Sequence, residues 1–258
     1  MARVLITGSG RGLGLMVGEL LVQQGHRVVL HARDARRAVD TRAALPAAED
    51  VLVGDLSSID AMRSVAEQAN ETGRFDAVIH NAGVGYRERY PVTADGLSHV
   101  FAINVLAPYL LTALIMPPNG LVHLSSGMHQ GGSAGLGDPQ WERRRRQAAQ
   151  AYSDSKLFDV LLAFGVARHR PDVRSKALEP GWVPTRMGGP GAPDDISQAY
   201  VTRAWPAASD DPAADVTGRY FYHRRPRQPH PVAYDVAAQE ALLDYCAGLA
   251  GVPLPPSD

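Results

Sequence analysis

A glycine-rich stretch near the start of the chain constrains the fold more than any other feature. It directly follows the apolar run at residues 4–6, and its residues are Thr7, Gly8, Ser9, Gly10, Arg11, Gly12, Leu13 and Gly14. Helical periodicity extends over residues 12–24, and a second apolar run occupies residues 28–30. This order predicts a β-α-β unit whose glycines let a diphosphate approach the helix N-terminus. We therefore expect an α/β fold with a doubly wound parallel sheet.

A tyrosine and a lysine four residues apart form the second informative feature. On a helix, this spacing places Tyr152 and Lys156 on one face. A tyrosine titrates near pH ~10 in water, so acid–base chemistry at neutral pH needs a nearby cation to stabilise the phenolate. Lys156 is conspicuous because Lys176 is the only other lysine among the basic Lys and Arg positions. An ordinary exposed pair has the same spacing, so the motif gains its weight from the glycine stretch.

Together these motifs resemble those of the short-chain dehydrogenases/reductases. The pattern T-G-x-x-x-G-x-G, the Tyr152–Lys156 pair and a Pro180–Gly181 turn occur in the family's order and span nearly the whole chain. The resemblance implies a Rossmann-type fold and an NAD(P)-dependent oxidoreductase of class EC 1.1.1.-.

The resemblance also implies four catalytic residues. Tyr152 is expected to act as the general acid/base, with Lys156 lowering its pKa and binding the nicotinamide ribose. Ser126, with Ser125 as the alternative, is expected to orient the substrate oxygen. Asn104 is expected to complete a proton path, because a proline four positions later leaves its carbonyl without a helical partner.

Two loops are expected to shape the substrate pocket. The separation of Ser126 from Tyr152 is longer than usual and resembles the retinol-dehydrogenase-like branch, as does His129. The extra residues fall in a glycine-rich loop at about 127–147. A second Gly/Pro-rich loop, at about 182–200, is interpreted as a substrate lid.

The expected cofactor is NADP(H). An acid that would bind a free ribose 2′-hydroxyl is missing at Ala32, whereas Arg33 and Arg11 offer two guanidinium forks for a 2′-phosphate. Asp34 is interpreted as the N-cap of the next helix. Besides the glycine stretch, Tyr152 and Lys156, the resemblance assigns cofactor contacts to Asp55, Leu56, Asn81, Ala82, Gly83, Pro180, Gly181, Val183 and Thr185.

Composition argues against several other classes of protein. A chain of 258 residues can bury one core, so we expect a single domain over residues 1–258. The net charge of −1 gives no general attraction to nucleic acid or anionic lipid. No apolar stretch approaches the ~20 residues of a membrane span, and no charged apolar leader is seen, so a cytoplasmic location is expected. Cys246 is the only cysteine and cannot form an internal disulfide.

The expected partner is a small-molecule carbonyl or alcohol. Trp182 and Met187, and with them Trp141, favour an apolar substrate, although each such residue is more often plain core packing. The helix of Tyr152 is apolar on more than one face, so it either sits deep in the core or packs against a partner subunit. A homodimer is the default expectation, and the longer Ser-to-Tyr spacing leaves a monomer open.

Two other functions are compatible with parts of this pattern. A regulatory protein of the same fold could sense NADPH without catalysis, although the presence of all four catalytic residues argues against it. A sugar-nucleotide epimerase or dehydratase of the related longer family is disfavoured, because the chain lacks a substantial C-terminal substrate domain.

Overall fold

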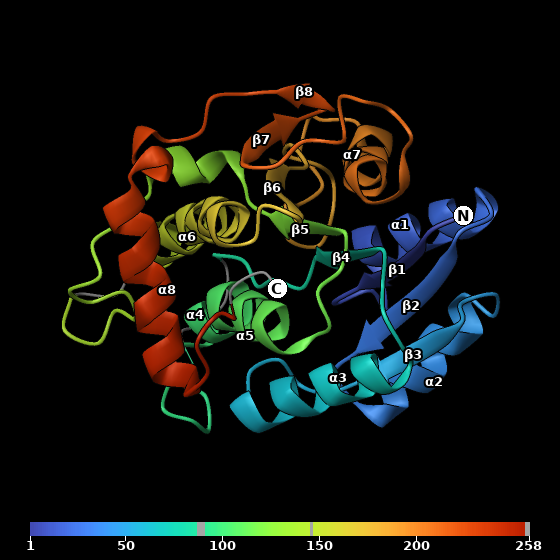
Figure 1. Ribbon diagram of the computed structural model, residues 1–258, viewed down its shortest axis with the longest axis horizontal. Helices are drawn as coiled ribbons and strands as arrows, with labels where there is room; N and C mark the ends of the chain where they lie inside the picture. The colour runs from blue at the N-terminus through green and yellow to red at the C-terminus, as the bar shows by residue number, and fades with distance from the viewer. Residues whose placement is uncertain (87–90, 145–146, 256–258) are drawn as a thin grey trace.

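A single sheet forms the frame of the molecule (Figure 1). The computed structural model describes residues 1–86, 91–144 and 147–255. In these parts of the chain the strand order is β3-β2-β1-β4-β5-β6-β7-β8. The strands are β1 (Arg3–Ile6), β2 (Arg27–Ala32), β3 (Asp50–Val53), β4 (Ala77–His80), β5 (Gly120–Leu124), β6 (Arg174–Glu179), β7 (Arg219–Tyr222) and β8 (Arg225–Pro226).

Strands β1 to β7 run parallel, and β8 runs antiparallel to β7. β1 is central, with Leu5 opposite Val29 of β2 and Val78 of β4. Every residue of β1, β4 and β5 is buried. Continuous burial of this kind is typical of a parallel sheet covered on both faces. The predicted doubly wound parallel sheet is therefore confirmed.

Helices cover both faces of the sheet (Figure 1). On one face α1 packs against α7, with Leu21 and Trp205 in a shared apolar cluster. The other face carries a larger cluster that joins α3, α5, α6 and α8. The helices are α1 (Gly12–Gln23), α2 (Ala35–Ala44), α3 (Ile59–Glu71), α4 (His99–Phe101), the π-helix η1 (Ala102–Leu106), α5 (Ala107–Leu114), the 3-10 helix η2 (Gly127–Gly131), α6 (Ala148–His169), α7 (Ile196–Ala208), the 3-10 helix η3 (Pro231–Tyr234) and α8 (Val236–Ala250).

The predicted lid at 182–200 is shorter than expected, because α7 already begins at Ile196. Asp195 caps this helix, since its Oδ1 accepts the N–H of Ser197 at 2.8 Å. The hairpin to β8 was also not predicted. Its turn residues His223 and Arg224 have φ of 47° and 63°, a conformation usually signalled by Gly or Asn. The sequence carries neither residue there, so the turn left no local signal.

The helix that contains Asn104 is interrupted, as its proline suggested. α4 passes into the π-helix η1, and regular α-helix resumes at Ala107, with Pro108 in the first turn of α5. The N–H of Ala107 donates to the carbonyl of Ala102, five residues earlier. Because Pro108 lies where an N–H needs no helical acceptor, the wider π turn accommodates the proline.

α6 lies deep in the molecule. All of its residues from Ala151 to Val166 are buried within the single chain. It packs against β5 and β6 on one side and against α8 on another. Of the two predicted environments for this helix, the structure thus provides the core, and no partner subunit is needed to cover it.

The described residues cover most of the predicted loop at 127–147, and they allow a search for membrane-spanning helices. The predicted loop at 127–147 starts with the 3-10 helix η2, and its residues 145–146 lie outside the described part of the chain. Within the described ranges, no helix combines the length and apolar character needed to cross a bilayer.

Two glycines of the stretch at residues 7–14 have left-handed backbones. Gly8 and Gly12 have φ of 61° and 59°. A Cβ added to Gly8 would lie 2.7 Å from Cα of Ala82, in the turn after β4, whereas a Cβ on Gly12 would meet nothing within 4 Å. Gly8 thus satisfies both a conformational and a packing requirement, and Gly12 only the first.

This difference predicts unequal costs for two alanine substitutions. Both Gly8→Ala and Gly12→Ala should lose about 1–2 kcal/mol through the left-handed backbone. Gly8→Ala should lose a further ~1–3 kcal/mol because its Cβ overpacks against the Ala82 backbone. Urea unfolding of both variants measures the difference, and equal losses would contradict the close contact between loop and turn.

Candidate functional site

The glycine loop and the turn after β4 are joined by hydrogen bonds. Asn81 Nδ2 donates to the carbonyl oxygens of Thr7 and Gly8, at 2.9 and 3.1 Å. The N–H of Ala82 donates to Thr7 Oγ1 at 3.0 Å. Asn81 and Ala82, both predicted cofactor residues, therefore fix the loop at the carboxyl ends of β1 and β4.

His31 holds the other side of the glycine loop and was not predicted. The N–H of Gly8 donates to its Nδ1 at 2.9 Å, and its Nε2 lies 2.9 Å from the carbonyl oxygen of Gly54, so Nε2 carries the proton. Burial lowers the pKa of His31, which favours this neutral form. Ser9 Oγ accepts the N–H of His31 and donates to Ile6 O, so the predicted contact residue Ser9 is bonded within the protein. The only signal in the sequence for this role of His31 was its position near the carboxyl end of the second strand.

Four guanidinium groups gather at the open side of the loop. Besides Arg11 they belong to Arg37, Arg186 and Arg33. Partial burial first, and then the charges of these three neighbours, lower the pKa of Arg11. Arg11 and Arg33 were predicted, whereas Arg37 and Arg186 come from α2 and the lid.

Asp34 offsets part of this positive charge. It caps α2 as predicted, with Oδ1 accepting the N–H of Arg37 at 2.8 Å. Its Oδ2 lies 3.4 Å from Arg33 Nε and 3.5 Å from Arg37 Nε. These exposed pairs are weak, and the cluster keeps an excess of cations over anions.

The remaining predicted residues near β3 and β4 differ in their surroundings. Asp55 is exposed, and its Oδ1 accepts the N–H of Ser57 at 3.0 Å, while Leu56 is buried. Gly83 lies beside the candidate catalytic groups: a Cβ there would be 3.4 Å from Asn104 Oδ1 and 3.6 Å from Lys156 Nζ.

Tyr152 and Lys156 lie on one face of α6, as their spacing predicted. Lys156 Nζ is 5.7 Å from the centre of the Tyr152 ring. The Tyr152 hydroxyl faces Met187 Sδ at 3.8 Å, and Tyr86 packs edge-on against its ring at 5.7 Å. Tyr152 is only 6% exposed, so the lid residue Met187 covers the phenol.

Lys156 also has a charged partner that was not predicted. Its Nζ donates to Asp159 Oδ2 at 2.8 Å and to the carbonyl oxygen of Leu124 at 2.7 Å. Burial raises the pKa of Asp159 to about 6, although Lys156 acts in the opposite direction. The i, i+3 spacing on one helix was the available signal.

Asn104 connects α6 to the loop after β4. Its Nδ2 donates to Ser155 Oγ at 3.0 Å and to Val84 O at 3.1 Å, and its Oδ1 accepts the N–H of Val84 at 2.8 Å. The side chain of Asn104 thus positions η1 against α6 and the loop after β4.

The two candidate serines after β5 have different environments. Ser125 is buried, and its Oγ donates to the carbonyl oxygen of Lys156 at 2.7 Å. Ser126 is half-buried and caps η2, with Oγ accepting the N–H of Met128 at 3.3 Å. Ser126 therefore has the more available hydroxyl, as the first choice from the sequence requires.

His129 supports the loop of Ser126 through a hydrogen bond to its backbone. Its Nδ1 lies 2.7 Å from the carbonyl oxygen of Ser126, and its Nε2 accepts the N–H of His230 at 3.1 Å. Burial, together with the charges of His230 and Arg227, lowers the pKa of His129, although the Ser126 carbonyl opposes this. The two partners specify a neutral ring with the proton on Nδ1.

The second predicted loop forms a closed turn. The N–H of Thr185 donates to Val183 O at 2.8 Å, and Thr185 Oγ1 accepts the N–H of Gly188 at 3.1 Å. Gly181, after Pro180, has φ of 85° and faces Asp194. Of the aromatic residues expected around the pocket, Trp182 is 56% exposed, and Trp141 is buried under Arg144.

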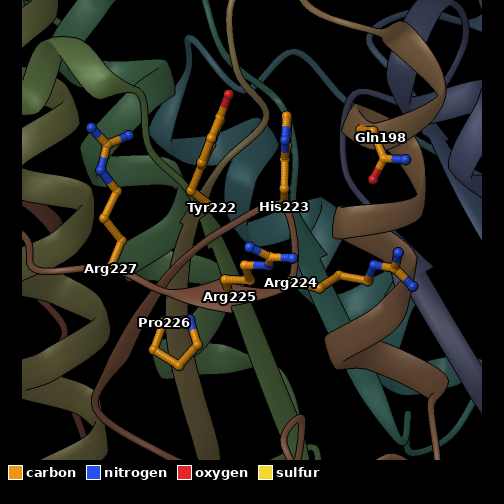
Figure 2. A pocket seen from close by; sticks show the side chains of 7 residues that line it. All are labelled: Gln198, Tyr222, His223, Arg224, Arg225, Pro226 and Arg227. Atoms are coloured by element: carbon orange, nitrogen blue, oxygen red, sulfur yellow. The ribbon is translucent and has the colours of Figure 1, made fainter.

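A cavity of about 440 Å³ lies at the β7–β8 hairpin. Figure 2 shows Gln198 and Arg227 at its two ends, with Tyr222 and His223 side by side between them. His223 meets the candidate site, because a Cβ on Gly181 would lie 3.3 Å from its Nε2. The cavity is lined by Gln198, Tyr222, His223, Arg224, Arg225, Pro226 and Arg227. No metal-ligand cluster of His, Cys, Asp or Glu occurs among the residues that the structure describes.

Known proteins share this sequence and fold. A model of the short chain dehydrogenase family matches residues 2–195. An uncharacterized oxidoreductase of Emericella nidulans is 42% identical, over 99% of both chains. Retinol dehydrogenase 13 of Homo sapiens is 29% identical, over 98% of this chain and 85% of its own. A protein from Mycobacterium paratuberculosis has a similar structure, with a TM-score of 0.83 and 25% identity over 99% of this chain and 95% of its own. The chain therefore belongs to the short-chain dehydrogenase family, with relatives in its retinol-dehydrogenase-like branch.

Proposed function

We propose that the protein transfers a hydride between NADP(H) and a carbonyl or alcohol group of an apolar small molecule. The observation that carries this proposal is the arrangement on α6, where Tyr152 and Lys156 share a buried face beside Gly83 and Asn104. A phenol in such a place can exchange a proton with a substrate oxygen, with an ammonium group held close to it.

The residues around the glycine loop fit a phosphorylated dinucleotide. Asp34 offsets only part of the charge of these four guanidinium groups, and after burial the charges of the other three lower the pKa of Arg11. A 2′-phosphate would relieve this repulsion through bidentate hydrogen bonds. Gly12, open on its Cβ side, leaves room near the N-terminus of α1. When bound, NADP(H) supplies the hydride.

Each candidate residue then has a separate task. Tyr152 gives or takes the proton of the substrate oxygen, and Ser126 hydrogen-bonds that oxygen. Lys156 provides the positive charge and a donor for the nicotinamide ribose. Asn104 ties η1 to α6 and keeps the proton path in register.

Asp159 changes the electrostatics that Lys156 provides. With the carboxyl ionised, Lys156 and Asp159 form a neutral pair, and the charge felt at Tyr152 is reduced. With the carboxyl protonated, the full charge of Lys156 remains. Since the pKa of Asp159 is raised to about 6, this exchange falls close to physiological pH.

The surroundings of the Tyr152 hydroxyl favour an apolar substrate. Met187 and Tyr86 pack against this side chain, and neither offers a charge. Displacement of Met187 would expose the phenol, so we propose that the lid moves when substrate enters. A homodimer, a cytoplasmic location and a single domain over residues 1–258 remain predictions.

Tyr152→Phe should bind cofactor and turn over poorly. Loss of the proton donor should reduce kcat by roughly 10²- to 10⁴-fold, with the NADPH dissociation constant within about twofold of the wild type. Tyr234→Phe, an exposed tyrosine, is the matched control. Carbonyl reductase assays with an aldehyde and ketone panel measure this, and full activity of Tyr152→Phe would refute the assignment. Tight NADPH binding without activity on any substrate would indicate the sensor instead.

The arginine cluster should make the protein prefer NADPH over NADH. Loss of one phosphate contact in Arg33→Ala should weaken NADPH binding by roughly 10- to 100-fold and leave NADH unchanged. Arg36→Ala, an exposed arginine at the second residue of α2, is the control. Titration by nicotinamide fluorescence gives both constants. Equal or better binding of NADH by the wild type would reject the clamp.

Asp159 should make stability fall as pH rises. Its folded pKa of about 6 exceeds the ordinary value of 3.8, so the folded state holds the proton more tightly, and that stabilisation is lost as pH rises through 6. Relative to Asp159→Asn, the wild type should lose about 2 kcal/mol between pH 4 and pH 7. Urea unfolding of both proteins across this range tests it, with Asp60→Asn as an exposed control. If the free energies of unfolding of the wild type and Asp159→Asn changed with pH in parallel, the raised pKa of Asp159 would be contradicted.

A further inference from the structure

Arg203 on α7 is a buried cation with unsatisfied hydrogen-bond donors. Only 7% of the surface of Arg203 is exposed. Among the described residues, neither its Nε nor its Nη1 has a hydrogen-bond partner. A guanidinium group removed from water without an anion or an acceptor is strongly unfavourable, and such groups are rare in folded proteins. Arg203 therefore calls for a partner that the described residues do not supply.

The position of Arg203 places that partner at the candidate site. α7 packs against α1 and against β4, β5 and β6, the strands that are followed by Asn81, Ser125 and Pro180. Helical side chains lean toward the N-terminus of their helix, and α7 begins where the lid ends. The guanidinium of Arg203 thus leans toward the end of α7 that follows the lid.

The electrostatic surroundings agree with this location. Burial lowers the pKa of Arg203 to about 10, and the charge of Tyr152 acts in the opposite direction. The group therefore stays protonated at neutral pH, and it lies within electrostatic range of the candidate catalytic tyrosine. Within the part of the chain that the structure describes, no carboxylate contributes to the pKa of Arg203.

Backbone donors of the glycine loop are partly used within the protein. The N–H of Gly8 donates to His31 Nδ1 at 2.9 Å, and the N–H of Ser9 donates to the His31 carbonyl at 3.1 Å. An anion that enters between this loop and the lid therefore meets fewer free N–H groups. A buried guanidinium with two free donor nitrogens can supply what is missing.

We propose that Arg203 is a binding residue for the diphosphate of the nicotinamide dinucleotide. This rests on the proposed function and adds to it a contact from α7, outside the glycine loop and the arginine cluster at the 2′-phosphate. The planar fork of the guanidinium matches phosphate oxygens, and an anion would satisfy Nε and Nη1 together. The guanidinium of Arg203 would thus be unpaired in the free protein and paired with the diphosphate in the dinucleotide complex.

A stability measurement on the free protein tests the first half of this proposal. Arg203→Met removes an unpaired buried charge and keeps an unbranched side chain, so it should raise the thermal midpoint without cofactor by several degrees. Arg203→Lys keeps the charge and should give no such gain. Arg219→Met, at the exposed start of β7, is the control for losing one arginine. A lower midpoint for Arg203→Met would show that Arg203 is a structural residue and overturn the proposal.

Binding of dinucleotide fragments tests the second half. Arg203→Met should weaken 2′-phospho-ADP-ribose, which carries the diphosphate, by roughly 10- to 100-fold in calorimetric titration. It should leave the affinity for 2′-AMP, which lacks the diphosphate, unchanged, and Arg203→Lys should lose less.

The outcomes separate this proposal from the proposed function. Equal binding of 2′-phospho-ADP-ribose by wild type and Arg203→Met would overturn only the role of Arg203. Equal weakening of both fragments would also overturn it, because the cleft as a whole would have changed. If the wild type bound neither NADPH nor its fragments, the proposed function itself would fail and this proposal with it.

Discussion

The burial of α6 is the constraint on which the rest of the site depends. A helix without an exposed face in its central turns cannot rotate or slide without opening the core. Tyr152 and Lys156 therefore owe their places to apolar packing around them and not to contacts with each other. The same packing carries Asp159 inside, where a carboxylate would not otherwise be stable. The sheet, the π turn at Asn104 and the serine loop are all arranged around a helix whose position is already fixed.

Positive charge is distributed locally and not over the whole molecule. The chain as a whole carries a net charge of −1, yet cations gather near the glycine loop, α2 and the lid. Arg203 is buried on α7, and the other guanidinium groups lie near the glycine loop. The proposed dinucleotide would therefore meet positive charge both at its diphosphate and at its 2′-phosphate. A buried cation without an anion lowers the stability of a free protein, as is common where a fold is adapted to a ligand.

The sequence predicted those parts of the site that depend on local chemistry. Glycine loop, strands, helix caps such as Asp34 and the Tyr152–Lys156 spacing were all readable, because each follows from neighbouring residues. The lid boundary was missed because Gly and Pro before Asp195 concealed the helix behind them. His31, Arg37 and Arg186 were missed because their roles arise between segments far apart in the chain. Asp159 lay within reach of a spacing argument, but its burial is a property of the packed core.

The bond between His129 and His230 joins residues 101 positions apart. During synthesis the glycine loop, Ser126 and Tyr152 leave the ribosome long before His230 does, and chains acquire structure from the N-terminus onward. A nascent chain can therefore contain the glycine loop, Ser126 and Tyr152 before His230 is available to bond to His129. The hydrogen bond that supports the Ser126 loop can therefore form only after residue 230 has been synthesised.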